Sequence, residues 1–316
     1  MRIIIIDEVH NALIDTLAEA NYQLNYVPKI KADELKTIVA DYNGIIVRSK
    51  MRISSELIDI AKNLKFIARV GAGLENIDTE YAKSKNIKVI NSPEGNRDAV
   101  GEHAVAMLLN IFNKINIANT QVKTGVWDRE QNRGEELGGK TIGIIGYGNT
   151  GSAFAKKLSG FNVKVLAYDK YKKGFSDNYV TETNLNNLLN KVDVLSFHVP
   201  LTDETKQMFN DGFIQKIKNN IYLINTSRGE VVDTKDLVVA LKNKKIKAAC
   251  LDVLEYEKLS FEDIYNNNNN NNAEFNYLIN SENVILTPHI AGWTHQSYYK
   301  ISKIIAEKII DKFHLL

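Results

Sequence analysis

Cysteine and long apolar segments are almost absent from this chain. Its 316 residues include one cysteine, Cys250, which cannot form an internal disulfide. It lies in the apolar run 248–251, so we expect a small buried side chain in a protein of the reducing cytosol. No run of about 18 apolar residues is present, which excludes a transmembrane helix. The start of the chain, residues 1–7, is too short for a signal peptide and includes an acidic residue.

Charge of one sign and metal-ligand patterns are also lacking. The formal net charge is +2, which provides no general attraction to nucleic acid or to a membrane surface. No group of histidines and cysteines has the spacing of metal ligands, so we predict no metal. The chain is 44% hydrophobic and 25% charged. This composition is typical of a globular protein, and the length predicts two domains of ordinary size.

Strand and helix signals alternate along most of the chain, which predicts parallel sheets covered by helices. In the first part we expect strands at 3–6, 44–47, 64–70 and 88–91, with helices at 9–20, 32–42, 56–63 and 79–85. One long helix is expected over 96–124. Further strands are expected at 141–145, 163–168, 193–198, 221–225, 247–252 and 284–287, followed by a helix over 298–313.

These elements predict an α/β protein with two Rossmann-like domains, one flavodoxin-like and one NAD-binding, and a cleft between them. We expect a discontinuous substrate-binding domain, residues 1–93 plus 295–316, with the NAD-binding domain, 94–294, inserted in it. The seven asparagines at 266–272 are interpreted as a low-complexity insertion in a solvent loop. The alternative is an adaptable loop beside the site.

A glycine motif follows the strand expected at 141–145. It matches G-x-G-x-x-G, and its residues are Gly146, Tyr147, Gly148, Asn149, Thr150 and Gly151. Such glycines allow a tight turn, close approach of the backbone to a pyrophosphate and close helix–strand packing. A second strand leads to Asp169, 18 positions after Gly151. A carboxylate there accepts hydrogen bonds from ribose hydroxyls and repels a 2′-phosphate, so the motif predicts NAD; the adjacent Lys170 weakens the preference over NADP.

Three ionisable residues stand just beyond expected strand ends: Arg228, Glu257 and His289. Parallel strands bring such ends to one edge of a sheet, so the three side chains are expected to converge. A neutral imidazole accepts a hydroxyl proton, a neighbouring carboxylate fixes its tautomer, and a guanidinium holds a substrate carboxylate. In isolation, each residue has an ordinary alternative: a turn with a surface ion pair for Arg228, a solvated side chain for Glu257 and a loop histidine for His289. Of the other histidines, His198 is expected to line the cofactor pocket, and His103 to be structural or near the cleft.

Taken together, the motifs resemble those of the D-isomer-specific 2-hydroxyacid dehydrogenases. The resemblance covers residues 44–293 and rests on the glycine motif and on the segments 197–202, 225–230, 251–257 and 287–292. It implies that Arg228, Glu257 and His289 are catalytic and that the backbone amides of Gly71, Ala72 and Gly73 bind the substrate carboxylate. It also implies a cofactor site that includes His198, Val199, Pro200, Thr202, Thr226, Ser227, Asp252, Ala291 and Gly292. A homodimer formed through the helix at 98–120 is a further implication. Lys258 departs from the family, which commonly has proline there.

The substrate is predicted from cations near first-domain strand ends. Arg48, Ser49 and Lys50 follow one strand and Arg69 ends another, and three cations are more than one carboxylate requires, so we expect a phosphate. The alternative is that Lys50 and Arg52 are solvated and only Arg48 contacts the substrate. This order is similar to that of the D-3-phosphoglycerate dehydrogenase branch, here in a short form without a regulatory domain. It implies oxidation of D-3-phosphoglycerate to 3-phosphohydroxypyruvate in serine biosynthesis. The alternatives are a glyoxylate or hydroxypyruvate reductase, a less favoured formate dehydrogenase, and a non-catalytic NAD-sensing protein like the family's corepressors.

Overall fold

The computed structural model describes residues 1–257 and 272–313. The chain divides into two compact units. Among the described residues, unit 1 comprises 1–97 and 293–313, and unit 2 comprises 98–257 and 272–292. Within these ranges no helix is long and apolar enough to cross a membrane.

Unit 1 is a five-stranded parallel sheet with helices on both faces. The strand order is β2-β1-β3-β4-β5, which is the flavodoxin-like order. The strands are β1 (Arg2–Ile5), β2 (Gln23–Tyr26), β3 (Gly44–Val47), β4 (Phe66–Arg69) and β5 (Lys88–Asn91). The helices are α1 (Asn11–Glu19), α2 (Ala32–Ile38), η1 (Val39–Asp41), α3 (Ser55–Ile60), α4 (Thr79–Ser84) and α12 (His295–Lys312).

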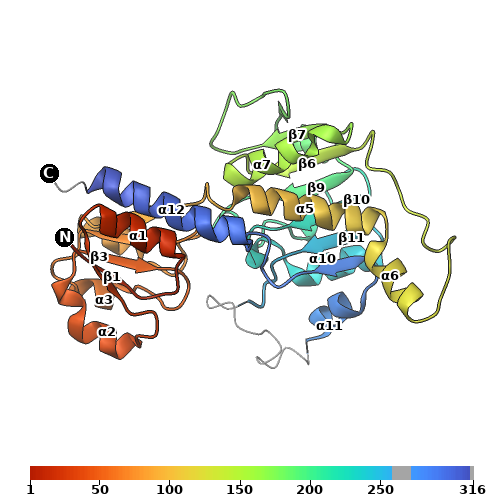
Figure 1. Cartoon of the computed structure of the whole chain (residues 1–316). Coiled ribbons are helices and arrows are strands. Elements are labelled where there is room, and N and C mark those ends of the chain that lie inside the picture. The colour runs from red at the N-terminus through yellow and green to blue at the C-terminus, as the bar shows by residue number, and fades with distance from the viewer. Residues whose placement is uncertain (258–271, 314–316) are drawn as a thin grey trace. The chain divides into compact units, whose positions relative to one another are not determined.

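Alternation along β1 explains how both faces of this sheet are covered. Ile3 and Ile5 point to one face, where they pack with α1 and with Ile305 of α12. Ile4 packs on the other face with residues of α2 and α3. Helix α12, blue in Figure 1, lies along α1 although nearly the whole chain separates them. The C-terminal helix is therefore part of the first unit.

Unit 2 is a seven-stranded parallel sheet with the order β12-β11-β10-β9-β6-β7-β8. This is the Rossmann order 3-2-1-4-5-6 with one strand added at the β12 edge. The strands are β6 (Thr141–Ile145), β7 (Lys164–Tyr168), β8 (Thr181–Glu182), β9 (Val194–Phe197), β10 (Ile221–Asn225), β11 (Ile246–Leu251) and β12 (Val284–Leu286). The helices are α5 (Arg97–Phe112), α6 (Ile115–Lys123), α7 (Asn149–Lys157), η2 (Leu158–Gly160), α8 (Leu185–Leu189), α9 (Asp211–Ile214), η3 (Gly229–Val231), α10 (Thr234–Lys242) and α11 (Ala273–Asn280).

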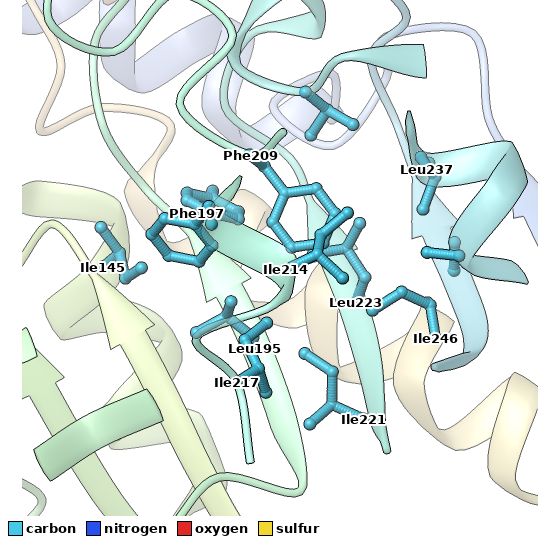
Figure 2. Close-up of a cluster of buried hydrophobic side chains, with 14 of the residues drawn as sticks. Ile145, Leu195, Phe197, Phe209, Ile214, Ile217, Ile221, Leu223, Leu237 and Ile246 are labelled. Atoms are coloured by element: carbon cyan, nitrogen blue, oxygen red, sulfur yellow. The ribbon is translucent and has the colours of Figure 1, made fainter. Parts of the chain in front are cut away.

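Two cores flank this sheet. On one face, shown in Figure 2, the rings of Phe197 and Phe209 meet edge to face with centroids 5.7 Å apart, and Leu223 of β10 packs with Leu237 of α10. On the other face, α5 and α7 pack on the sheet with Cys250. The Cys250 thiol is buried, which raises its pKa to about 12, so the predicted role as a small hydrophobic side chain is confirmed.

The two-domain α/β prediction is confirmed, but three element predictions are wrong. The helix expected over 96–124 is two helices, because Lys114 adopts a left-handed conformation (φ 52°) and the Phe112 carbonyl accepts a hydrogen bond from Glu135 instead. The strands β2 and β8 were not predicted. Both are edge strands with largely exposed residues, so they lack the apolar pattern that a buried strand produces. The asparagine run lies outside the described residues except for Asn272, which caps α11.

Candidate active site

His289 and Glu257 form a close pair in unit 2. The His289 Nδ1 atom lies 2.6 Å from Glu257 Oε2, and both side chains are largely shielded from solvent. The other oxygen of Glu257 accepts a hydrogen bond from the backbone of Leu254, which fixes the carboxylate. A carboxylate that accepts from Nδ1–H leaves Nε2 as the nitrogen that accepts a proton. The pair is therefore arranged for proton transfer at Nε2.

Asp252, directly after β11, holds the His289 loop. Its buried carboxylate accepts hydrogen bonds from the backbone N–H groups of Ile290 (2.9 Å) and Ala291 (2.8 Å) and from the Thr287 hydroxyl. His289 itself has φ 55°, a left-handed conformation that non-glycine residues adopt only when their surroundings impose it. Asp252 thus orients the loop that carries His289.

Arg228 extends from the end of the neighbouring strand β10. Its Nη1 donates to the Ser227 carbonyl (2.7 Å), and its own carbonyl accepts from Asn225 (2.9 Å). At Gly229, an added Cβ would lie only 2.0 Å from the Leu254 backbone, so the Arg228 loop packs against the loop that carries Glu257. Because β10, β11 and β12 are adjacent and parallel, Arg228, Glu257 and His289 share one edge of the sheet.

The glycine motif lies where the order of the second sheet reverses, between β6 and β9. Gly146 has φ 91°, and a Cβ there would lie 2.6 Å from the His198 carbonyl. A Cβ at Gly151 would lie 2.1 Å from the Gly146 carbonyl, whereas one at Gly148 would meet nothing within 4 Å. Gly146 and Gly151 are therefore required by packing, and Gly148 leaves space in front of the α7 N-terminus for a pyrophosphate.

Asp169 lies beside this space. Its carboxylate accepts backbone hydrogen bonds from Tyr147 (2.8 Å), Tyr171 (2.9 Å) and Lys172 (2.9 Å). Burial alone would raise the pKa of Asp169, but these hydrogen bonds outweigh it and lower the pKa. Asp169 also lines a hollow of about 600 Å³ whose other walls are Tyr147, Gly148, Asn149, Ser152, Tyr171 and Lys172. An ionised carboxylate at this position fits the adenosine ribose of NAD.

His198 is buried and contacts the glycine motif through the hydroxyl of Thr150. Its ring nitrogens lie 2.9 Å from the Ser196 hydroxyl and 3.3 Å from the Thr150 hydroxyl. Burial lowers the His198 pKa to about 3, so the ring stays neutral. The structure thus places His198 between β9 and α7.

The remaining predicted cofactor residues lie in the loops after β9, β10 and β12. Thr205 closes the loop after β9, because its hydroxyl binds the Pro200 carbonyl (2.6 Å) and the Thr202 amide (2.8 Å). Within the described residues, the buried Thr226 hydroxyl has no hydrogen-bond partner, and an orphaned hydroxyl of this kind suits a polar group of a cofactor. Val199 lies against Gly146. The others are Ser227, bound to Asn225 (2.7 Å), and Ala291 and Gly292, which follow His289.

In unit 1, the loop after β3 is organised by Asp7. One oxygen of its carboxylate accepts from the backbone N–H groups of Arg48 (3.0 Å), Ser49 (2.8 Å) and Lys50 (2.9 Å). Asp7 follows β1 and Arg48 follows β3, the two strands between which the order of this sheet reverses. Ligands bind at such reversals, outside the carboxyl ends of the strands.

The segment 71–73 follows β4. The Gly71 amide donates to the Ser92 hydroxyl (3.2 Å), so it is not available to a substrate. Within the described ranges, the amides of Ala72 and Gly73 donate to no protein acceptor, and the Ala72 carbonyl accepts from the Asn91 side chain. The Arg69 side chain folds against Gly71, where a Cβ would lie 1.6 Å from its Nη1. Gly71, at φ 143°, is therefore required by its backbone conformation, whereas the Arg69 side chain beside it can move.

Several of these supporting residues were not predicted as part of the site. Asp7, Ser92 and Thr205 bind backbone groups of predicted site residues, and His103 Nε2 lies 3.1 Å from the Thr287 hydroxyl and 3.5 Å from Asp252. For Asp7 a signal was present, because an acidic residue directly follows an apolar strand. The Ser92 and His103 contacts join residues 21 and 184 positions apart, and no local pattern indicates them, whereas Thr205 acts within its own loop.

Comparison with known proteins gives consistent matches. The profile of the NAD binding domain of D-isomer specific 2-hydroxyacid dehydrogenases matches residues 105–291, more than half of the chain. A D-3-phosphoglycerate dehydrogenase of Archaeoglobus fulgidus is 35% identical over 98% of this chain, which spans only 57% of that protein. A hydroxypyruvate reductase of Thermotoga maritima is 36% identical over 90% of this chain and 89% of its own length. Among solved structures, a D-lactate dehydrogenase of Aquifex aeolicus, complexed with NAD and lactic acid, has a TM-score of 0.82 and 32% identity over 99% of this chain and 96% of that chain.

Proposed function

Because the chain belongs to the D-isomer-specific 2-hydroxyacid dehydrogenase family, we propose that it oxidises a D-2-hydroxy acid with NAD. The observation that carries this proposal is the pair of His289 and Glu257, 2.6 Å apart at the edge of the sheet that also holds the glycine motif. A protein that only sensed NAD would not need an imidazole held by a carboxylate at this place.

The residues of unit 2 divide the chemistry among them. His289 Nε2 accepts the hydroxyl proton of the substrate, while Glu257 holds the imidazole and stabilises the charge that it acquires. Arg228 binds the substrate carboxylate through its guanidinium. The chemistry that NAD would supply at this site is a hydride acceptor for the substrate carbon. The Thr226 hydroxyl, Asp169 and the space at Gly148 are the features that suit this cofactor.

We propose D-3-phosphoglycerate as the substrate, which places the protein in serine biosynthesis. Arg48, Lys50 and Arg69 all follow or end strands of unit 1, and more than one cation suits a doubly charged phosphate. The amides of Ala72 and Gly73 are proposed to bind the substrate carboxylate. Substrate binding is then the task of 1–93 plus 295–316, and NAD binding that of 94–294. The single buried cysteine suits a cytosolic location.

Hydroxypyruvate reduction is the second candidate. It is favoured by the match to the Thermotoga maritima reductase, which is 36% identical over 90% of this chain. The same catalytic pair serves both directions, because His289 donates in reduction the proton that it accepts in oxidation.

Initial rates decide between these candidates. We expect kcat/KM with NAD to be roughly 10- to 100-fold higher for D-3-phosphoglycerate than for D-glycerate, since the second compound lacks the phosphate contacts. A higher kcat/KM for D-glycerate or D-lactate than for D-3-phosphoglycerate would exclude the phosphate assignment. In the reverse direction with NADH, a higher kcat/KM for hydroxypyruvate than for 3-phosphohydroxypyruvate would exclude it as well. No turnover with any of these acids would exclude the enzyme.

The assembly is proposed to be a homodimer formed through α5 and α6. Helix α6 exposes two large apolar side chains, Ile115 and Val122, each more than half exposed. Further exposed apolar side chains follow at Val126 and Trp127. Contact with a second copy of the chain would remove these apolar side chains from water, which favours association.

A further inference from the structure

Arg48 occupies an unusual place in unit 1. It directly follows β3, where the order of the sheet reverses, and its backbone is fixed by Asp7 (3.0 Å). Its side chain lies over the ring of Trp293, with the guanidinium carbon 3.8 Å from the ring centroid, and 5.4 Å from that of Tyr298. The guanidinium is therefore supported by two aromatic rings.

The aromatic support is itself held in place. The rings of Trp293 and Tyr298 lie 5.9 Å apart, and Tyr298 meets the ring of His10 edge to face at 5.6 Å. His10 caps α1, and its amide donates to Ser302 of α12 (3.3 Å). The two rings thus belong to a network that joins the start of α1 to α12.

The charge of Arg48 is only partly compensated inside unit 1. Burial lowers the pKa of Arg48, and the nearby Asp7 carboxylate offsets part of this effect. One oxygen of that carboxylate already accepts from three backbone amides. Within 1–257 and 272–313, the side-chain N–H groups of Arg48 donate to no protein acceptor. A stacked guanidinium with its donor edge unused is suited to bind an oxyanion in a bidentate manner.

The other two cations of the predicted substrate site are engaged differently. The Lys50 ammonium donates to the carbonyl of Pro28 and lies on an exposed residue. The Arg69 side chain folds against Gly71. Arg48 is thus the cation whose orientation is fixed by stacking and whose donors point to no protein group in the described part of the chain.

We propose that Trp293 and Tyr298 are positioning residues that hold the Arg48 guanidinium as the receptor for the phosphate of the substrate. This inference rests on the proposed function for the identity of the substrate. Trp293 stands four positions after His289, and the chain passes from unit 2 to unit 1 between Gly292 and Trp293. His289, the proposed proton acceptor, and Trp293, the proposed support of Arg48, therefore lie on one short continuous segment of the chain.

Fluorescence tests the receptor without relying on turnover. The chain has two tryptophans, so a Trp127→Phe protein reports on Trp293 alone. Titration of this protein with inorganic phosphate and with D-3-phosphoglycerate is expected to change the emission in a saturable manner, because an anion at Arg48 alters the charge over the indole ring. The change should be lost in Trp127→Phe/Arg48→Gln. No change in the first protein, or the same change in both, would overturn the inference.

Kinetics test the positioning role. Trp293→Leu is expected to raise KM for the acid roughly 5- to 30-fold, the contribution of a stacked cation, with kcat and KM for NAD within about twofold of the wild type. Trp293→Phe, which keeps a ring face, should restore most of the affinity. The matched control is Tyr299→Leu, an exposed aromatic residue of α12 that contacts His10 instead.

The outcomes separate this inference from the proposed function. If Trp293→Leu and Tyr299→Leu behave alike, or if Trp293→Leu changes KM for NAD instead, Trp293 does not position Arg48. If the wild type oxidises none of the acids, the proposed function fails, and the fluorescence titration alone then decides whether Arg48 is an anion receptor.

Discussion

His289 illustrates how a single residue depends on contacts from a neighbouring loop, here the one that follows β11. Its ring is held by the carboxylate of Glu257. Its backbone is held by Asp252, whose carboxylate accepts hydrogen bonds from the backbone N–H groups of Ile290 and Ala291, the two residues after His289. The left-handed backbone at His289 costs about 1 kcal/mol or more and persists because these contacts determine it. The loop is therefore shaped before any substrate binds.

Replacing His289 by Gln is expected to lower kcat roughly 10²- to 10⁴-fold, because glutamine cannot accept the hydroxyl proton. Glu257→Gln should have a smaller effect, since an amide still accepts from Nδ1–H but does not stabilise the imidazolium. The measurement is steady-state turnover with saturating NAD. His295→Gln, at an exposed position six residues away, is the control. Unchanged turnover in His289→Gln would remove His289 from the acid–base role.

His198 makes stability depend on pH. Its pKa is about 3 in the folded protein and 6.5 without the fold, so below pH 6.5 the unfolded chain binds a proton that the folded protein does not. The contribution of His198 to the free energy of unfolding is therefore complete above pH 6.5. It decreases by about 1.4 kcal/mol per pH unit as the pH falls from 6.5 towards 3.

The variant His198→Gln isolates this effect, because glutamine can still bind Ser196 and Thr150 but does not titrate. From pH 7.5 to pH 5.0, the free energy of unfolding of the wild type should fall by roughly 2 kcal/mol more than that of the variant. Urea denaturation followed by circular dichroism measures both values. Other titrating groups are common to both proteins. Equal pH dependence in the two proteins would show that His198 is not held neutral by burial.

At the scale of elements, the turn from β6 to α7 shows that equivalent glycines of one motif have different tasks. Gly151 is in contact with the backbone of Gly146, whereas nothing in the described chain lies near a Cβ at Gly148. Gly148 has φ −88°, a negative value that does not by itself require glycine. The packing of the fold thus requires Gly151, and the approach of a ligand is what requires Gly148.

Alanine at each position separates these tasks. Gly148→Ala is expected to leave the melting temperature within a few degrees of the wild type and to raise KM for NAD, because the methyl group enters the space of the pyrophosphate. Gly151→Ala should destabilise the protein by about 1–3 kcal/mol, through overpacking against backbone, and also raise KM for NAD. Thermal unfolding and initial rates measure both. A fully active Gly148→Ala protein would contradict the pyrophosphate assignment.

The break between α5 and α6 shows where reasoning about elements fails. The apolar spacing over 96–124 is helical throughout, and both pieces are indeed helices. The interruption comes from Lys114 in a left-handed conformation and from a hydrogen bond between Glu135 and the end of α5. Glu135 lies 23 positions after Phe112, so the apolar spacing within 96–124 cannot indicate this hydrogen bond.

For the whole molecule, the exposed apolar side chains of α6 lead to a prediction about assembly. Val122→Asp is expected to convert the proposed dimer to a monomer, since a carboxylate buried at an interface lacks a partner. Size-exclusion chromatography with light scattering measures the mass. Val239→Asp on α10 is the control, because Val239 is equally exposed (53% against 52%) on another helix. A monomeric wild type would exclude the dimer, and a dimeric Val122→Asp protein would move the interface away from α6.

The sequence alone determined the cofactor motif, the α/β class and the identity of the residues at strand ends. Glycine spacing and buried strands such as 141–145 are local patterns, and parallel strands bring their carboxyl ends to one edge whatever the loops do. The tertiary structure decided which of these residues are held together: Glu257 with His289, Asp7 with the loop after β3, and Arg48 with Trp293. Such pairs join residues 32 to 245 positions apart. Their formation depends on packing of distant segments, which no window of the sequence contains.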